Sequence, residues 1–217
     1  MDSNRSAARP DNWVASLRAF VGAAATAVEH CELCSAEIGV EHAHLVELQS
    51  RRLLCACAAC ALLFDNDDAD QRFRRVPRGA RRLHDFALSD VQWDALLIPI
   101  NMAFFYRRSP RGRVVAMYPG PAGATESTLD LGAWDELVAA NPWLDDLRAD
   151  VEALLVYRVG GAREYYRVPI DRCYALVGTI RTHWHGVSGG QGSREAIQAF
   201  FGALRAETAK AREVAHA

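Results

Sequence analysis

The stretch HCELCSAEIGVEHAHLVELQSRRLLCACAACALLF, residues 30–64, holds five of the six cysteines of the chain. Four of them form two C-x-x-C pairs, Cys31/Cys34 and Cys57/Cys60, separated by 22 residues. Each C-x-x-C turn brings two sulfur atoms close to one metal ion, and a hairpin between the turns folds one pair onto the other. Four thiolates then complete a tetrahedron with no open position, so such a site is structural. The spacing therefore predicts a small zinc-ribbon or treble-clef-like module of four cysteines that binds metal through Cys31, Cys34, Cys57 and Cys60.

The segment between the two pairs supports this interpretation. The runs HLVEL (44–48) and RRLLC (51–55) are short and strand-like, and the residues between them are typical of a turn. The run ACALLF (59–64) then indicates the first turn of a helix that leaves the second C-x-x-C pair. The sequence thus predicts a β-hairpin followed by a helix.

Cys55 and three nearby histidines leave alternatives for the ligand set. Cys55 lies two residues before Cys57, so in a strand both side chains face the same side. We favour Cys57 and Cys60 because they repeat the spacing of the first pair, which makes Cys55 a buried thiol beside the site. In the alternative, Cys55 replaces one of the four ligands. A site that recruits one histidine is a further alternative, and the nearby histidines are His30, His42 and His44.

Zinc is the expected metal, and iron is the alternative. A rubredoxin also uses two C-x-x-C knuckles to hold a single iron ion, and a four-sulfur site fits both metals. Rubredoxin knuckles usually continue with glycine, and the second often begins with Cys-Pro. Here Ser35 and Ala61 follow the two pairs, and Ala58 stands in the proline position. The sequence therefore favours zinc.

Composition limits the classes of function. Half of the 217 residues are hydrophobic and 24% are charged, which is typical of a globular chain that can bury a core. The net charge of −2 argues against a general affinity for nucleic acid or anionic membranes. The N-terminus shows no apolar signal segment, and apolar runs are shorter than the ~18 residues of a membrane span. We therefore expect a cytoplasmic protein, where clustered cysteines are more often metal ligands than disulfides.

The sequence predicts three parts: an N-terminal tail and helix at 1–29, the four-cysteine metal-binding module at 30–66, and an α+β body at 67–217. Strands that cluster between non-alternating helices favour α+β over a parallel α/β sheet. The predicted body contains two β-hairpins and a C-terminal helical segment. Its expected elements are a helix at 89–97 capped by Ser89, a hairpin of strands at 98–108 and 111–119, a loop at 120–127, a helix at 131–147 broken at Asn141-Pro142, a second hairpin at 152–159 and 163–170, and helices at 171–187 and 193–215.

An arginine-rich segment follows the module. It lies between 71 and 83 and contains Arg72, Arg74, Arg75, Arg78, Arg81 and Arg82. One interpretation is an exposed or edge strand whose arginines pair with the acidic connector DNDDAD at 65–70. The other is a docking surface for an acidic partner or for nucleic acid, whose association would weaken with salt. Phe73 is the only aromatic residue of the segment, which disfavours binding of single-stranded nucleic acid.

No catalytic residue is predicted. A nuclease of the HNH type also mounts a histidine on a treble clef, but it needs an Asn/His pair on the following helix, and no histidine follows Cys60 until His84. Cys173 lies in an apolar helical stripe and is interpreted as a buried core thiol. His183 and His185 lie two residues apart, so they face different sides of a helix and cannot easily share a metal ion. P-loop, nucleophile-elbow and H-E-x-x-H motifs are absent from the sequence.

Several segments together carry a resemblance to a known family. They are CELC (31–34), HLVELQSRRLLCACAACALLF (44–64), IPINMAFFY (98–106), YPGPAGATES (118–127), VEALLVYR (151–158) and VPIDRCYALVGTIRTHWHGVSGG (168–190). In these segments the chain resembles an uncharacterised family of bacterial proteins encoded near genes of nickel–iron hydrogenases. The resemblance implies an accessory role in hydrogenase maturation, assembly or electron transfer.

The leading hypothesis is a non-enzymatic, metal-binding accessory protein of the cytoplasm that docks a protein partner, which by the resemblance is a hydrogenase or its maturation machinery. An alternative is a rubredoxin-like electron-transfer protein with one iron held by four cysteines. A further alternative is a zinc-dependent enzyme in which Cys55, Cys173 or a histidine acts. Binding to membranes or nucleic acid is not expected.

Overall fold

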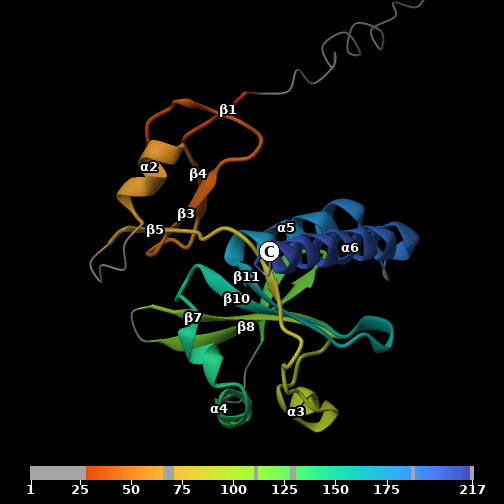
Figure 1. The fold of residues 1–217 in the computed structure, drawn as a ribbon. Coiled ribbons are helices and arrows are strands. Elements are labelled where there is room, and N and C mark those ends of the chain that lie inside the picture. The colour runs from red at the N-terminus through yellow and green to blue at the C-terminus, as the bar shows by residue number, and fades with distance from the viewer. Residues whose placement is uncertain (1–27, 66–70, 110–111, 128–130, 187–188, 216–217) are drawn as a thin grey trace, which may run out of the picture.

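The structure is a computed structural model that describes residues 28–65, 71–109, 112–127, 131–186 and 189–215. The helix expected before residue 29 lies almost wholly outside these residues, and so does the connector at 66–70. The described chain is α+β, as the sequence predicts, with the cysteine cluster near its start, β-sheets after it and a long C-terminal helix (Figure 1).

The N-terminal module contains two small sheets and one helix. Strands β1 (Glu29–His30) and β2 (Glu37–Ile38) form a ribbon, while β3 (Ala43–Glu47), β4 (Leu53–Ala56) and β5 (Phe73–Arg75) form a sheet in the order β4-β3-β5. The helix α2 (Ala58–Leu63) begins directly after β4. The predicted hairpin and helix are therefore present, and the arginine-rich segment supplies β5 as an edge strand.

The body is built on one six-stranded antiparallel sheet. Its order is β6-β11-β10-β7-β8-β9, and the strands are β6 (Arg81–Arg82), β7 (Met102–Arg108), β8 (Arg113–Gly120), β9 (Gly123–Ser127), β10 (Glu152–Tyr157) and β11 (Glu164–Pro169). The two hairpins predicted from sequence, β7–β8 and β10–β11, lie side by side because β10 pairs with β7. The strands predicted separately thus form one continuous sheet.

Helices cover both faces of this sheet. The described helices of the body are α3 (Asp90–Ala95), α4 (Leu131–Ala140), α5 (Ile170–His183) and α6 (Gly190–Ala215), with short 3-10 turns η1 (Pro142–Asp146) and η2 (Val159–Gly161). Helices α5 and α6 lie on one side, and α3 and α4 on the other (Figure 1). None of the helices in the described ranges combines the length and apolar character that a membrane crossing requires.

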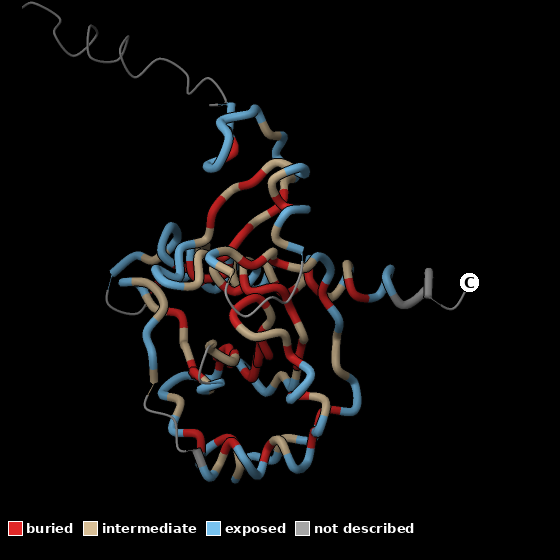
Figure 2. Tube along the Cα trace, turned by 90° about the vertical axis from the view of Figure 1, so that its left-hand side faces the viewer, coloured by how far each residue is buried: buried red, intermediate tan, exposed pale blue. Residues whose placement is uncertain are grey.

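Alternating residues of the central strands point to opposite faces of the sheet and pack into two separate cores. Phe104 and Leu155 face α5 and α6, whereas Phe105 and Leu154 face α3 and α4. This follows from the two-residue period of a strand, which sends neighbouring side chains to opposite faces. Buried residues accordingly concentrate in the body sheet (Figure 2). The module has a smaller core of its own, separate from the two cores of the body.

One predicted loop is a strand. The segment GPAGATES, expected to be a loop, forms the end of β8, a turn at Pro121 and Ala122, and β9. Gly120 and Gly123 face each other across this turn, and Gly123 has a φ of 127°, which favours glycine. The strand was missed because it consists mostly of small and polar residues at the sheet edge, where little apolar alternation is needed.

Side chains of the module pack against the body. Val46 of β3 belongs to the body core, because it lies on the face of the hairpin opposite to Leu45, which packs inside the module. The Arg74 guanidinium on β5 pairs with Asp150 at 3.2 Å and donates to the Ala149 carbonyl at 3.0 Å. The predicted boundary between module and body stays a prediction, but β5 lies beyond it in sequence and pairs with β3.

Candidate metal centre

The four predicted ligands form one cluster. The sulfur atoms of Cys31, Cys34, Cys57 and Cys60 lie within 4.8 Å of one another. Cys34 and Cys57 are 3.7 Å apart, close to the ~3.8 Å that separates two thiolates bound tetrahedrally at ~2.3 Å from zinc. The cluster can therefore hold a metal ion. That these four residues are the ligands remains a prediction.

Local backbone geometry sets both halves of the cluster. In the first knuckle, the Ser35 N–H donates to the Cys31 carbonyl at 2.8 Å, and Ser35 has a φ of 60° that tightens the turn between β1 and β2. In the second, Cys57 occupies the N-cap of α2, and its sulfur accepts the Cys60 N–H at 3.4 Å. The Glu32 N–H donates to the Cys55 carbonyl at 2.9 Å and ties the first knuckle to β4. The arrangement of knuckle, hairpin and helix is that of a treble clef.

The pKa shifts of Cys31 and Cys60 conflict, because one thiol ionises more easily than usual and the other less easily. Burial raises the pKa of Cys31, but hydrogen bonds from the backbone N–H groups of Cys57, Cys34 and Leu33 outweigh it and lower the pKa to about 6. Hydrogen bonds with the side chains of Cys34 and Cys57 raise the pKa of Cys60 to about 12. Because a coordinated thiol is deprotonated outright, a bound cation would remove this conflict.

Cys55 lies beside this cluster and faces away from it. In the β3–β4 register, Cys55 lies opposite His44, and one ring nitrogen each of His42 and His44 lies within 4.8 Å of the Cys55 sulfur and of each other. These three residues form a second group, separate from the four cysteines. Burial, and then the charges of Glu29 and Glu32, raise the pKa of the Cys55 thiol. From the sequence, each histidine was expected at most to replace one ligand of the first cluster or to act in a zinc-dependent enzyme, and a second group was not expected. The hairpin register would have shown the second group.

Asp171 was not expected from the sequence to contact His44. It was expected only near the start of a helix, and it does lie in the first turn of α5. Its carboxylate also accepts a hydrogen bond from Nδ1 of His44 at 2.9 Å, across 127 positions of sequence. No signal in the sequence connects these two residues, because their contact depends on how the module packs on the body.

The other predicted candidates lie elsewhere. Cys173 is fully buried in the body core, and burial raises its pKa well above the usual value, as expected for an inert thiol. His183 is in the last turn of α5, with Nδ1 2.9 Å from the Thr179 carbonyl, and His185 follows the helix. Neither histidine joins a group of metal-ligating side chains within the described residues.

Half of the arginine-rich segment is engaged in ion pairs. Arg72 pairs with Glu47 at 2.6 Å and Arg75 pairs with Asp65 at 2.5 Å, while Arg74 pairs with Asp150. The pairing with Asp65 agrees with the first interpretation of the segment. The guanidinium of Arg82 lies 6.0 Å from the centre of the Tyr166 ring.

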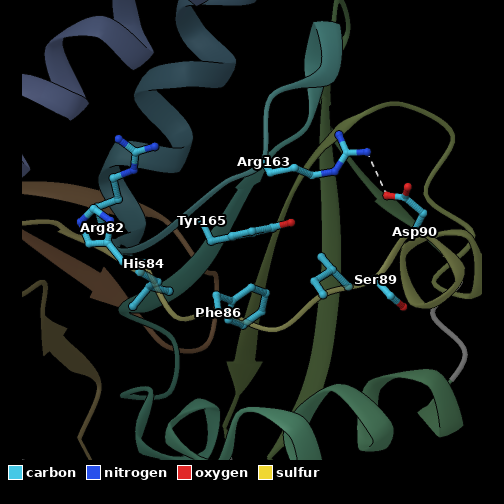
Figure 3. A pocket seen from close by; sticks show the side chains of 9 residues that line it. Arg82, His84, Phe86, Ser89, Asp90, Arg163 and Tyr165 are labelled. Atoms are coloured by element: carbon cyan, nitrogen blue, oxygen red, sulfur yellow. Dashed lines mark hydrogen bonds and ion pairs between the residues drawn. The ribbon is translucent and has the colours of Figure 1, made fainter.

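A cavity of about 470 Å³ opens between β6, β11 and α3 (Figure 3). All of the residues that line it belong to the body, and none belongs to the four-cysteine module. Arg163 and Asp90 form an ion pair of 2.9 Å at one end, and Arg82 and His84 lie at the other, with Tyr165 between them. The hydrogen bond from Arg158, and the charge of Arg163, lower the pKa of Asp90. Since the Asp90 carboxylate is held by the guanidinium groups of Arg158 and Arg163, it is engaged in ion pairs rather than free to accept a proton from a ligand.

Residues 30–208 match the model of a family described as "Family of unknown function (DUF5947)". The match spans both the cysteine cluster and the sheet, and agrees with the resemblance to an uncharacterised family. No curated protein matches, and no solved structure matches.

Proposed function

Since the chain belongs to this family of unknown function, whose description carries no activity, we propose from the geometry a metal-binding accessory protein of the cytoplasm. Its four-cysteine module holds a structural zinc ion and helps to dock a protein partner. The observation that carries the proposal is the closed cluster of four cysteines, in which a C-x-x-C turn and the start of a helix face one another. Four thiolates leave a bound zinc ion no free position, so the metal would order the module rather than perform chemistry.

Exposure of one ligand favours a second candidate function. Cys34 lies at the surface, while Cys31 is buried, so electrons could reach a bound iron ion through the exposed edge. A rubredoxin-like protein, with one iron held by the four cysteines, would use this edge toward an oxidoreductase. We place zinc first because Ser35, Ala58 and Ala61 stand where rubredoxin knuckles usually carry glycine or proline.

Apolar side chains exposed on the module support a protein partner. Clustered apolar surface marks interaction sites on soluble proteins. Four of the nine exposed large hydrophobic residues of the described chain lie in the module, namely Leu33, Val40, Leu62 and Leu63, and Val28 lies just before it. The arginine-rich segment, favoured from sequence, is in part committed to Glu47, Asp65 and Asp150. We therefore place the partner against the module, with α2 as its central contact. The resemblance identifies a hydrogenase or its maturation machinery as the partner to test.

Metal analysis of untagged protein purified without added metal tests the metal assignment. We expect zinc that is lost in Cys57→Ser and retained at this cluster in Cys55→Ser. Iron with strong visible absorption would instead support the electron-transfer candidate. Retention of the metal in Cys57→Ser would show that the ligand set is wrong.

Partner capture tests the docking role. The variant Leu62→Ser/Leu63→Ser removes apolar surface from α2, whereas Val91→Ser removes an equally exposed side chain from α3 and serves as the control. We expect hydrogenase subunits or maturation factors to be captured from an extract of hydrogenase-producing cells by wild type and Val91→Ser, and several-fold less by the α2 variant. Equal capture by all three proteins would refute docking through α2.

A further inference from the structure

Two histidines and one cysteine converge on the face of the β3–β4 hairpin that is turned toward the body. His42 and His44 lie two residues apart, and Cys55 lies opposite His44. One ring nitrogen of each histidine and the Cys55 sulfur lie within 4.8 Å of one another. Ligands bound tetrahedrally at 2.0–2.3 Å are separated by about 3.5 Å. Small side-chain rotations would therefore bring all three donors onto one ion.

The hydrogen bonds of the two imidazoles fix which nitrogen is available. The Nδ1 atom of His44 lies 2.9 Å from the Asp171 carboxylate, and that of His42 lies 2.9 Å from the Gly39 carbonyl. Both partners only accept hydrogen bonds, so Nδ1 carries the proton in each ring, and Nε2 keeps its lone pair. A carboxylate or carbonyl behind Nδ1 is the usual arrangement of a metal-binding histidine.

Two buried polar atoms in this region have no hydrogen-bond partner among the residues that the structure describes. The His42 side chain is only 9% exposed, and among the described residues its Nε2 has no hydrogen-bond partner. The same holds for Oδ1 of Asp171. Buried nitrogen and oxygen atoms in folded proteins are nearly always satisfied, so an unpaired lone pair beside a thiol needs an explanation. A metal ion between the three side chains would supply one for His42.

The group also borders open space. His42, His44 and Asp171 line a cavity of about 420 Å³ between the module and α5, together with Arg78 and Arg172. An ion held by three protein donors keeps a fourth position, and the cavity leaves room there for water or a small anion. This differs from the closed four-cysteine cluster.

We propose that His42, His44 and Cys55 form a second metal site, specific for a borderline divalent transition metal such as zinc or cobalt. Two imidazole nitrogens and one thiolate are the donors that such ions prefer. Asp171 is a positioning residue that orients His44 and ties the site to the body. A Cys55–His44–Asp171 nucleophilic triad would leave His42 and its unpaired Nε2 without a role, so the metal site accounts for more of the geometry.

Titration of untagged, metal-free full-length protein with Co²⁺ tests the proposal directly. We expect two equivalents per chain, of which the tighter gives an intense thiolate-to-cobalt band, and the second adds a weaker band from a single thiolate. Alkylation of Cys55, followed by mass spectrometry, should slow at least tenfold when the second equivalent binds. Wild-type protein that saturates at one equivalent, with Cys55 equally reactive before and after, overturns the proposal.

Variants assign the second equivalent to these residues. His44→Gln and Cys55→Ser should each bind one equivalent and keep the intense band. Asp171→Ala should weaken only the second equivalent, by about 10–100-fold, as loss of an orienting partner does in other metal sites. His183→Gln, an exposed histidine on α5 outside both groups, is the control and should bind two. A second equivalent that persists unchanged in Cys55→Ser and His44→Gln would show that it binds elsewhere and would refute the assignment.

Discussion

The buried ion pair between Arg74 and Asp150 should contribute strongly to the packing of the module on the body. Arg74 belongs to β5, which completes the sheet of the module, whereas Asp150 precedes β10 of the body sheet. The two side chains are 10% and 8% exposed, and the Asp150 carboxylate also accepts the Ser109 N–H at 3.1 Å. The change that tests this contact is Arg74→Met, which keeps most of the side-chain length and removes the charge.

The expected cost follows from burial. Removal of one partner from a buried ion pair typically costs about 3–5 kcal/mol, because the remaining charge is left uncompensated in a poorly solvated site. Within the described residues, the Asp150 carboxylate would keep the hydrogen bond from the Ser109 N–H, so we expect a loss of about 3 kcal/mol in the free energy of unfolding. The neighbouring pair Arg72–Glu47 gives the contrast, since the Arg72 side chain is 72% exposed. Exposed pairs contribute about 0–1 kcal/mol.

Denaturant unfolding of metal-loaded protein measures both effects. Arg74 lies in β5 and Arg72 immediately precedes it, so Arg74→Met and the control Arg72→Met make the same substitution at a buried and at an exposed ion pair of one segment. Adding Asp150→Asn to Arg74→Met should recover part of the loss, with a coupling energy of about 1–3 kcal/mol in the double-mutant cycle. Equal destabilisation by the two arginine variants, or a coupling energy near zero, would refute the reasoning that this pair joins the two parts.

Two further predictions concern metal removal and pH. Among the described residues, the buried core of the module has only Leu45 and Leu54 as large side chains. Chelation of the metal should therefore expose residues 30–75 to proteolysis and leave a resistant fragment that begins near residue 76. Global unfolding with no resistant fragment would contradict this. The pKa of Asp90 is lowered by Arg158 and Arg163, so its contribution to stability is present above the unfolded pKa of about 4 and is lost as pH falls through the lower folded pKa. Asp90→Asn should therefore destabilise the protein at pH 7, and the difference from wild type in thermal unfolding should shrink in acid; a difference that is constant with pH would count against the ion pairs.

Features set by neighbouring residues could be predicted from the sequence. The C-x-x-C spacing places four sulfurs in one cluster, and Ser89 with Gln92 forms the capping box that begins α3. The helix α4 ends at Ala140, where Asn141-Pro142 was expected to break it. Each of these depends on a few consecutive residues, whose backbone preferences are local.

Features set by topology could not be predicted. The side chains of His44 and Asp171 meet across 127 positions, and those of Arg74 and Asp150 across 76. Both contacts exist because the hairpin packs on α5 and beside the start of β10, and no pattern in the sequence encodes that placement. The strand β9 was missed for a different reason, since its small and polar residues lack the continuous apolar runs, MAFFY and ALLVY, that indicated β7 and β10.

The two groups of residues that could hold a metal ion share one hairpin, and this would impose an order on their assembly. The carbonyl of Cys55 accepts the N–H of Glu32 in the first knuckle, so the end of β4 is positioned by the same turn that carries Cys31 and Cys34. The donors of the second group are correctly spaced only while β3 and β4 are paired in register. A metal ion in the four-cysteine cluster would therefore prepare the second site, whereas an ion in the second site holds no residue of the first. Loss of the closed cluster should remove both ions, and loss of the second group should remove only one. In the proposed arrangement the four-cysteine site is the scaffold, and the open coordination position belongs to the second site, between module and body.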